Sequence, residues 1–369
     1  MPTPSRGTSV RGAVTVAPFA RESGGEADAP LRRLVPGAVL ERWRAVDRSA
    51  HAPRLVTVVG DDGGASAAAL VTARPGTAYL KIVDAVGEVP SAVAAVVAHA
   101  REQGLAQVKW EGWTADPETA AAAGFTPLDP PHGRAPDAVG PETGHVRWLT
   151  GGPASEPPPY YGQTTRFTCG AVTALVALSH LGALPRAEFD RRAELTLWRA
   201  ATNFPACEPV GLGVAVRRTW PSSPVAVHLD ADGPVLLDHL AGDEREWRAV
   251  LQRASRADAA GMGVPIDPER LTVAGIRDAV DRGERVLLLV SLAVMQGFDV
   301  PHWVVCHGVV PGAVLIDDPW SHAPAGDTWV DAHLLPVPDG SLDTMSTLGE
   351  DGFRGAVRIG PARPVTASG

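Results

Sequence analysis

The feature that most constrains the fold is an apolar stretch that directly follows a cysteine. Residues 170–182 read GAVTALVALSHLG and are apolar on nearly every face of a helix. Such a helix must be enclosed by protein on all sides, and Gly182 is a typical residue to end it. The sequence therefore predicts a buried central helix with Cys169 in its first turn.

The position of Cys169 has a chemical consequence. Thiolate is the nucleophilic form of cysteine, and the positive end of a helix together with a nearby imidazolium lowers the thiol pKa from about 8.5. Gly170 leaves room for a substrate backbone, and Gln163 can donate its side-chain NH2 to an oxyanion beside the backbone N–H of Cys169. Taken singly, Gln163 also fits a solvated loop residue and Cys169 a small buried hydrophobic residue. We interpret the combined pattern as catalytic.

A candidate base lies in a second segment, PHWVVCHGVVPGAVLIDDPW, at residues 301–320. The run that begins at His302 predicts a strand in which His302 and His307 point to opposite faces, so only one can face the cysteine. We favour His302 because it begins the strand, near a sheet edge where a cleft can open, and we interpret His307 as structural. The apolar run 286–295 predicts another buried strand before it.

The next predicted strand ends in the sequence Asp317, Asp318, Pro319. A carboxylate there can accept the second imidazole N–H of His302 and fix its tautomer. Asp318 is favoured over Asp317 because the following proline forces extended geometry and holds this carboxylate at the strand end. Both acids also fit a turn before a proline, without a catalytic role.

Charge and cysteine content exclude several classes of partner. The formal net charge is −9 and no block of consecutive Lys or Arg occurs, so neither nucleic acid nor an anionic membrane is expected as a partner. The apolar runs are well below the roughly 20 residues that a membrane helix requires. Three cysteines in 369 residues give no disulfide framework, which fits a reducing, cytoplasmic compartment.

The remaining cysteines leave two alternatives to weigh. A zinc site lacks the CxxC pair or HxxxH helix that would support it, so no metal and no cofactor is expected. Its ligands would be Cys169, His302, Cys306 and His307. Cys207 lies in a proline-bounded loop and could line the cleft or act as a redox partner of Cys169, but we interpret it as a buried structural residue.

The length of the chain favours two domains. Residues 1–30 are rich in Gly, Ser, Pro and charge and predict a flexible leader, with folding from about Leu31. Proline and glycine then concentrate again between about Leu128 and Tyr161, and we assign a linker to 151–160. The expected domains are therefore residues 31–150 and 161–360.

The first domain shows an α/β pattern. Strands are expected at 55–59, 67–72, 77–83 and 106–110, and helices at 90–103 and just before Gly124. This order, with AAAAGFTPL at 120–128, resembles a GNAT-type acetyltransferase. In that family glycine-rich amides before the central helix cradle the coenzyme A pyrophosphate. Here the loop reads DAVGEVPSAV, so we interpret the domain as a degenerate GNAT-like module for recognition or scaffolding.

The second domain resembles a different family. QTTRFTCGA, PHWVV and IDDPW resemble the bacteriocin-leader-processing papain-like cysteine peptidases, especially a bacterial subgroup in which that domain follows a GNAT-like one. The segments 194–216 and 232–238 also resemble that subgroup, and Cys306 departs from it. The resemblance implies an α+β fold of a helix and an antiparallel sheet. It also implies Cys169 as nucleophile, His302 as base, Asp318 as its orienting acid and Gln163 in the oxyanion hole.

These observations predict a thiol hydrolase that acts on a peptide or amide through a cysteine acyl-thioester. An acyltransferase that delivers the same thioester to an amine is the alternative, because the active-site residues do not separate water from amine as acceptor. A non-catalytic peptide-binding module and a GNAT acetyltransferase are less favoured. The expected partner is a peptide or acyl substrate, and no oligomeric state is assigned.

Overall fold

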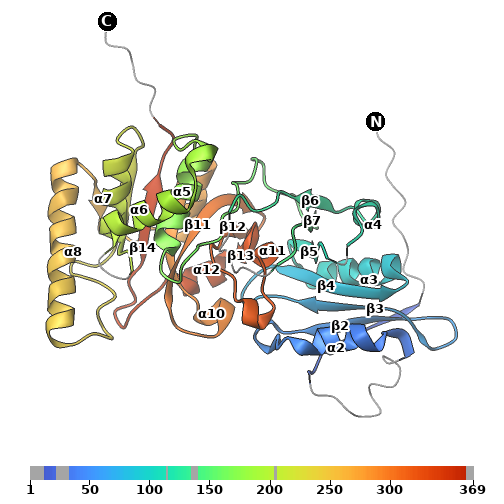
Figure 1. Cartoon of the computed structure of the whole chain (residues 1–369). Helices are drawn as coiled ribbons and strands as arrows, with labels where there is room; N and C mark the ends of the chain where they lie inside the picture. Colours follow the sequence, from blue (N-terminus) through green and yellow to red (C-terminus); the bar gives the residue numbers. More distant parts are fainter. Residues whose placement is uncertain (1–11, 22–32, 114, 134–139, 203–205, 363–369) are drawn as a thin grey trace, which may run out of the picture. The chain divides into compact units, whose positions relative to one another are not determined.

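The computed structural model describes residues 12–21, 33–113, 115–133, 140–202 and 206–362 (Figure 1). The chain divides into two compact units. The first comprises Met1–Pro130, Val139–Gly152 and His322–Asp331, and the second comprises Pro131–Ala138, Pro153–Ser321 and Ala332–Gly369. Residues 322–331 thus group with the first unit, although they lie within the range expected for the second domain.

The first unit is built on a sheet with the strand order β1-β2-β3-β4-β5-β7-β6. Its strands are antiparallel except for the parallel pair β4 and β5, which are joined through helix α3 (Val89–Glu102). The strands are β1 (Ala13–Pro18), β2 (Arg54–Val59), β3 (Ala65–Thr72), β4 (Tyr79–Gly87), β5 (Gln107–Glu111), β6 (Thr126–Leu128) and β7 (Gly144–Trp148). The α/β order expected from the sequence is confirmed.

Helices cover both faces of this sheet (Figure 1). Alternate side chains of β4 divide between two cores: Leu80 and Ile82 pack in the cluster of α3, whereas Val83 packs with Trp43 of α2 (Gly37–Ala45). Because successive strand residues point to opposite faces, α2 and α3 lie on opposite sides. The unit also contains the short helix α4 (Pro117–Ala122) and the 3₁₀ helix η2 (Ser49–His51).

The expectation of a flexible leader over residues 1–30 is wrong for strand β1. Ala13–Pro18 pairs antiparallel with β2 in continuous register, from Ala13 opposite Val59 to Pro18 opposite Arg54. Nearly all of this edge strand is exposed, so backbone pairing rather than burial holds it, and composition does not reveal such pairing. Residues 1–11 and 22–30 lie outside the described part of the chain.

Residues 322–331 bring two buried acids into the first unit. Asp327 accepts two hydrogen bonds from Arg74, at 3.2 Å from Nε and 2.6 Å from Nη2, and both side chains are fully buried. Asp331 forms an ion pair with Lys81, which also lies 2.6 Å from Glu111. Charges buried this deeply persist only when they are paired. These ion pairs therefore fix residues 322–331 to β4, β5 and the turn before β4.

The second unit contains a sheet with the order β13-β12-β11-β10-β14-β8-β9, antiparallel apart from the short pair β8 and β9. The strands are β8 (Val225–Leu229), β9 (Ile266–Asp267), β10 (Arg285–Ser291), β11 (Pro301–Val310), β12 (Ala313–Asp317), β13 (Leu335–Pro338) and β14 (Gly355–Ile359). The helices are α5 (Cys169–His180), α6 (Arg191–Ala201), α7 (Pro209–Thr219), α8 (Gly242–Met262), α9 (Val273–Asp281), α10 (Ala293–Gln296) and α12 (Asp339–Met345). The 3₁₀ helix η3 (Arg186–Glu188) also belongs here, whereas η4 (Ala323–Ala325) lies in the first unit and α11 (Trp329–Ala332) at the end of its inserted segment.

Helix α5 is the expected buried central helix. It packs against β11 and β10 (Figure 1), and Gly170–Leu178 are all buried. It ends before Gly182, whose φ of +72° is the left-handed conformation that favours glycine. The α+β arrangement of a helix on an antiparallel sheet is confirmed. None of the described helices has both the length and the apolar character needed to cross a bilayer.

The prediction of one strand over 286–295 is wrong in its second half. Strand β10 ends at Ser291, and residues 293–296 form the helical turn α10. The Ser291 hydroxyl accepts a hydrogen bond from the Ala293 N–H at 3.1 Å, which turns the chain out of the sheet. Because a buried strand and a buried helical turn are both apolar, periodicity does not separate them.

Candidate active site

Cys169 is the first residue of α5 and is partly accessible to solvent. The glycine that follows it meets a different need from the one expected. A β-carbon at Gly170 would lie 3.0 Å from Cδ1 of Trp303 and 3.1 Å from Cβ of Cys207. Trp303 of β11 and Cys207 therefore fill the space beside Gly170. Glycine permits this close packing, and the expected room for a substrate backbone is not found at this position.

His302 lies between Cys169 and Asp318. Its Nε2 is 2.7 Å from Oδ1 of Asp318, and both side chains are buried. The same carboxylate oxygen accepts a hydrogen bond from the Trp320 N–H at 2.8 Å. The imidazole also acts on the Cys169 thiol and lowers its pKa. His302 therefore interacts with both the thiol and the carboxylate.

The pKa of the Cys169 thiol is lowered and the pKa of the His302 imidazole is raised. Burial alone raises the pKa of Cys169, but His302 and the backbone N–H groups of Trp303 and Gly170 lower it below its ordinary value. Burial alone lowers the pKa of His302, but Asp318 and Cys169 raise it to about 10. Both shifts favour a thiolate beside an imidazolium over a neutral thiol beside a neutral imidazole.

Gln163 joins this region through its backbone. Its N–H donates to the carbonyl of Pro319, the residue after Asp318, at 2.7 Å. Its side-chain Nε2 donates to the carbonyl of Thr165 at 2.8 Å, and the side-chain oxygen is buried without a hydrogen-bond partner among the described residues. One N–H of the side-chain amide is therefore held by the loop 163–169, and its second hydrogen is the one that could meet an oxyanion.

The neighbouring acid, Asp317, serves a separate cluster. Its Oδ1 lies 3.0 Å from Nδ1 of His333 and 3.3 Å from Nε2 of His307, and it accepts from the Leu334 N–H at 2.7 Å. Burial alone raises the pKa of Asp317, but His333 and His307 hold it far below its ordinary value. Asp318 thus binds His302, whereas Asp317 binds His307 and His333. His307 therefore belongs to the Asp317 cluster and is not the partner of the cysteine.

Comparison with known proteins finds a family match over this unit. The family described as Peptidase_C39 like matches residues 158–360, more than half of the chain. The chain belongs to this family. Membership in this C39-like family indicates a cysteine peptidase-like function, as the resemblance in QTTRFTCGA and PHWVV implies. No curated protein matches the chain.

Three solved structures are similar to parts of this family member. A C39-like peptidase from Bacillus anthracis is 11% identical and covers 56% of this chain and 98% of its own, with a TM-score of 0.31. The ribosomal-protein-S18-alanine N-acetyltransferase from Escherichia coli is 11% identical, and the match covers 39% of this chain and 99% of the acetyltransferase, with a TM-score of 0.25. A probable GNAT-family acetyltransferase from Chromobacterium violaceum is 18% identical, and the match covers 39% of this chain and 91% of the acetyltransferase, with a TM-score of 0.26.

The sequence interpretation missed one residue of the site, Glu194 of α6. This fully buried carboxylate accepts hydrogen bonds from the Thr164 N–H at 2.8 Å, the Thr168 hydroxyl at 2.5 Å and the Tyr161 hydroxyl at 3.2 Å. A signal was present, because Glu194 shares a helical face with the buried Leu197 and Ala201, where a charge is rare unless it is satisfied. Glu194 organises the loop that leads into Cys169.

Cys207 and Cys306 differ chemically from Cys169. All three are free thiols, but Cys207 and Cys306 are buried. Burial raises the pKa of Cys306 to about 12, and burial followed by the nearby Cys169 raises that of Cys207 well above its ordinary value. Both stay protonated at neutral pH. The carbonyl of Cys207 accepts from Trp303 Nε1 at 3.0 Å, which agrees with a structural interpretation.

The loop before α3 does not fit the pyrophosphate of coenzyme A. The Glu88 N–H donates to Ser66, and the N–H groups of Ser91 and Ala92 both donate back to the Glu88 carbonyl. Pro90 has no N–H to offer. Gly87, with φ of +73°, is explained by packing, because a β-carbon there would lie 2.3 Å from the Ser66 carbonyl oxygen. The N–H groups of Glu88, Ser91 and Ala92 are therefore already bonded within the loop, and Pro90 supplies none.

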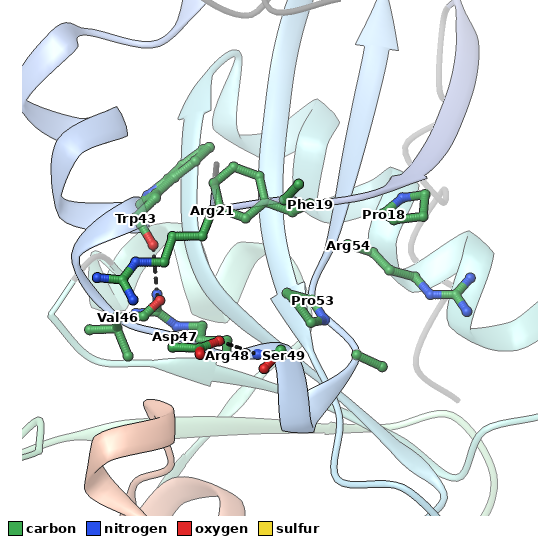
Figure 2. A pocket seen from close by; sticks show the side chains of 12 residues that line it. Pro18, Phe19, Arg21, Trp43, Val46, Asp47, Arg48, Ser49, Pro53 and Arg54 are labelled. Atoms are coloured by element: carbon green, nitrogen blue, oxygen red, sulfur yellow. Dashed lines mark hydrogen bonds between the residues drawn. The ribbon is translucent and has the colours of Figure 1, made fainter. Parts of the chain in front are cut away.

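A hollow of about 370 Å³ lies in the first unit (Figure 2). Phe19 and Trp43 form one wall, edge to face with ring centroids 6.1 Å apart. Figure 2 shows Arg48 bonded to the Trp43 carbonyl, a hydrogen bond of 2.8 Å. None of the four candidate site residues of the second unit lines it.

Proposed function

We propose that this chain is a thiol hydrolase that cleaves a peptide or amide bond through an acyl-thioester on Cys169. The observation that carries the proposal is the buried His302–Asp318 pair, 2.7 Å apart, whose imidazole also lowers the pKa of the Cys169 thiol. A thiol, a base and an orienting carboxylate in this order are the components of nucleophilic acyl transfer. The family match over residues 158–360 supports the same chemistry.

In this mechanism the Cys169 sulfur attacks the substrate carbonyl carbon, and the carbonyl oxygen becomes an oxyanion. The C–N bond then breaks while the His302 imidazolium gives its proton to the leaving amine. Neutral His302 next takes a proton from water, whose oxygen attacks the thioester, and the C–S bond breaks to release the acid. Asp318 keeps the imidazole oriented and stabilises its charged form in both steps.

Donors at the start of α5 would stabilise the oxyanion. The backbone N–H of Cys169 and the second N–H of the Gln163 side chain are the candidates, and each such donor contributes roughly 10²–10³ in rate. The Gln163 backbone bond to Pro319 supports this role, because it ties the glutamine to the residue after Asp318.

Incubation with a peptide pool, followed by mass spectrometry of the intact protein, tests the proposal. We expect an acyl adduct on Cys169, because its pKa is lowered, and none on Cys207 or Cys306, whose pKa values are raised. The Cys169→Ala variant is the control and should carry no adduct. An absent adduct and equal iodoacetamide labelling of all three thiols at pH 6 to 7 would contradict the proposal. An amide that forms faster than acid when an amine is added would assign acyl transfer instead.

The value of kcat/KM for peptide hydrolysis should rise and then fall as the pH increases. On the acid side kcat/KM rises as Cys169 ionises, and the midpoint lies below the ordinary value of about 8.5 because the thiol pKa is lowered. On the alkaline side kcat/KM falls near pH 10, where His302 loses the proton that the leaving amine needs. Initial rates between pH 4 and 11 measure both limbs. An alkaline limb near 6.5 would show that Asp318 does not stabilise the imidazolium.

A further inference from the structure

Helix α5 begins in an unusual way. Its N-cap residue is Thr168, a type that commonly accepts a hydrogen bond from the backbone N–H two or three residues on. Thr168 makes no such bond, and its backbone angles of −94° and 9° differ from the extended conformation of a capping residue. Thr272, the same residue type at the start of α9, has extended angles and accepts from the Gly275 N–H. The difference therefore lies in the surroundings of Thr168.

The Thr168 hydroxyl is held by Glu194 instead. It donates to Oε1 of Glu194 at 2.5 Å and accepts from the Thr165 hydroxyl at 3.1 Å. The other described donors to Glu194 are the Thr164 N–H and the Tyr161 hydroxyl. Burial followed by Glu194 raises the pKa of Tyr161 well above its ordinary value, so Tyr161 stays a donor. All described donors to this carboxylate thus come from residues 161–168, the segment that ends at the helix start.

The consequence falls on the N–H groups of the first turn of α5. A capping hydroxyl at Thr168 would occupy the N–H of Gly170 or Ala171, the positions two and three residues on. The Thr168 hydroxyl is held by Glu194 and does not occupy the Gly170 N–H, which is one of the groups that lower the pKa of the Cys169 thiol. Groups of this kind stabilise a negative charge at a helix start.

We infer that Glu194 is a positioning residue for the candidate nucleophile. By holding the Thr168 hydroxyl it keeps the N-terminal N–H groups of α5 uncapped and available to the Cys169 sulfur and to the oxyanion of the acyl intermediate. This inference rests on the proposed function and adds to it a residue that does not touch the reacting atoms. Glu194 also binds the Thr164 N–H and the Tyr161 hydroxyl, but its effect on the N–H groups of α5 passes through the Thr168 hydroxyl, so the two side chains must be coupled.

A purely electrostatic role of Glu194 predicts the opposite sign. Removing a nearby negative charge would lower the pKa of Cys169 and speed its alkylation. Losing the positioning role would let Thr168 cap α5, raise the thiol pKa and slow alkylation. The titratable groups that act on Cys169 from its neighbours are His302 of β11 and Cys207 before α7, and neither is changed by a substitution at Glu194.

The test is a double-mutant cycle on the full chain, with iodoacetamide alkylation of Cys169 followed by mass at pH 5 to 9. Glu194→Ala should slow alkylation at pH 6.5 about five- to tenfold, which corresponds to the free energy of one capping hydrogen bond. The pH at which the alkylation rate reaches half of its maximum should rise. Thr168→Val alone should change the rate less than about twofold, because this hydroxyl caps nothing. Glu194→Ala with Thr168→Val should recover most of the rate, because no hydroxyl remains to occupy the N–H groups.

A double variant as slow as Glu194→Ala would overturn the inference, as would a Glu194→Ala variant that alkylates faster than the parent. If Glu194→Ala fails to fold, Glu194→Gln preserves the volume and should slow alkylation in the same direction but less. A charge effect would instead make Glu194→Gln faster. Alkylation needs no substrate, so a cycle that behaves as expected in a chain that cleaves no peptide would remove the proposed function alone.

Discussion

Replacing His302 by glutamine is expected to lower kcat/KM for peptide hydrolysis about 10⁴-fold, because two contributions are lost together. The Cys169 thiol loses the imidazolium that lowers its pKa, so less thiolate exists at neutral pH. The leaving amine also loses its proton donor. Glutamine remains polar at a site where Asp318 is completely buried, and so keeps a hydrogen-bond donor for that carboxylate.

His307→Gln is the matched control for this change. His307 lies on the same strand, is equally buried and stands beside an aspartate, Asp317. It belongs to the other cluster, so kcat/KM of the folded variant should stay within about threefold of the parent. Rates should be measured below the unfolding midpoint of both variants. Equal losses in the two variants would mean that buried histidine pairs matter here only for stability.

Arg74→Met is expected to destabilise the first unit by about 3–5 kcal/mol. Arg74 and Asp327 are fully buried, and methionine fills the space of the side chain without neutralising the carboxylate. The cost arises because an unpaired buried charge lacks the solvation that it has in the unfolded chain. The effect should appear in the strand beside the ion pairs, since β4 carries both Tyr79, which donates to Asp331 at 2.6 Å, and Lys81.

Native-state hydrogen exchange of the β4 N–H groups measures this free energy of opening. Arg218→Met is the control, because Arg218 and Asp258 are more than half exposed and such a pair contributes about 0–1 kcal/mol. Arg74→Met combined with Asp327→Leu should recover much of the loss, since both charges are then gone. Unchanged exchange in β4 after Arg74→Met would show that the pair does not hold residues 322–331.

Local patterns predicted much of the candidate site. The apolar run after Cys169 specified a buried helix because no amphipathic arrangement of those residues exists. Strand alternation separated His302 from His307, and the proline after Asp318 favoured that acid over Asp317. Each inference depends on residues within a few positions of one another, which is the range over which periodicity and backbone restriction act.

Long-range contacts account for what the sequence did not predict. Strand β1 exists because it pairs with β2, about forty residues on. The Gln163 backbone N–H binds the carbonyl of Pro319, more than 150 residues on. Glu194 gained its role from three donors that only the packing of α6 against the start of α5 brings together.

The sequence by itself indicated the two fold classes and the four candidate residues, because apolar periodicity, proline and glycine act on neighbouring positions. The family followed from the resemblance of QTTRFTCGA, PHWVV and IDDPW. Only the tertiary structure decided that residues 322–331 belong to the first unit and that Thr168 leaves its helix uncapped. The physical reason is that a buried charge must find a partner wherever the fold supplies one, and that partner can lie anywhere along the chain.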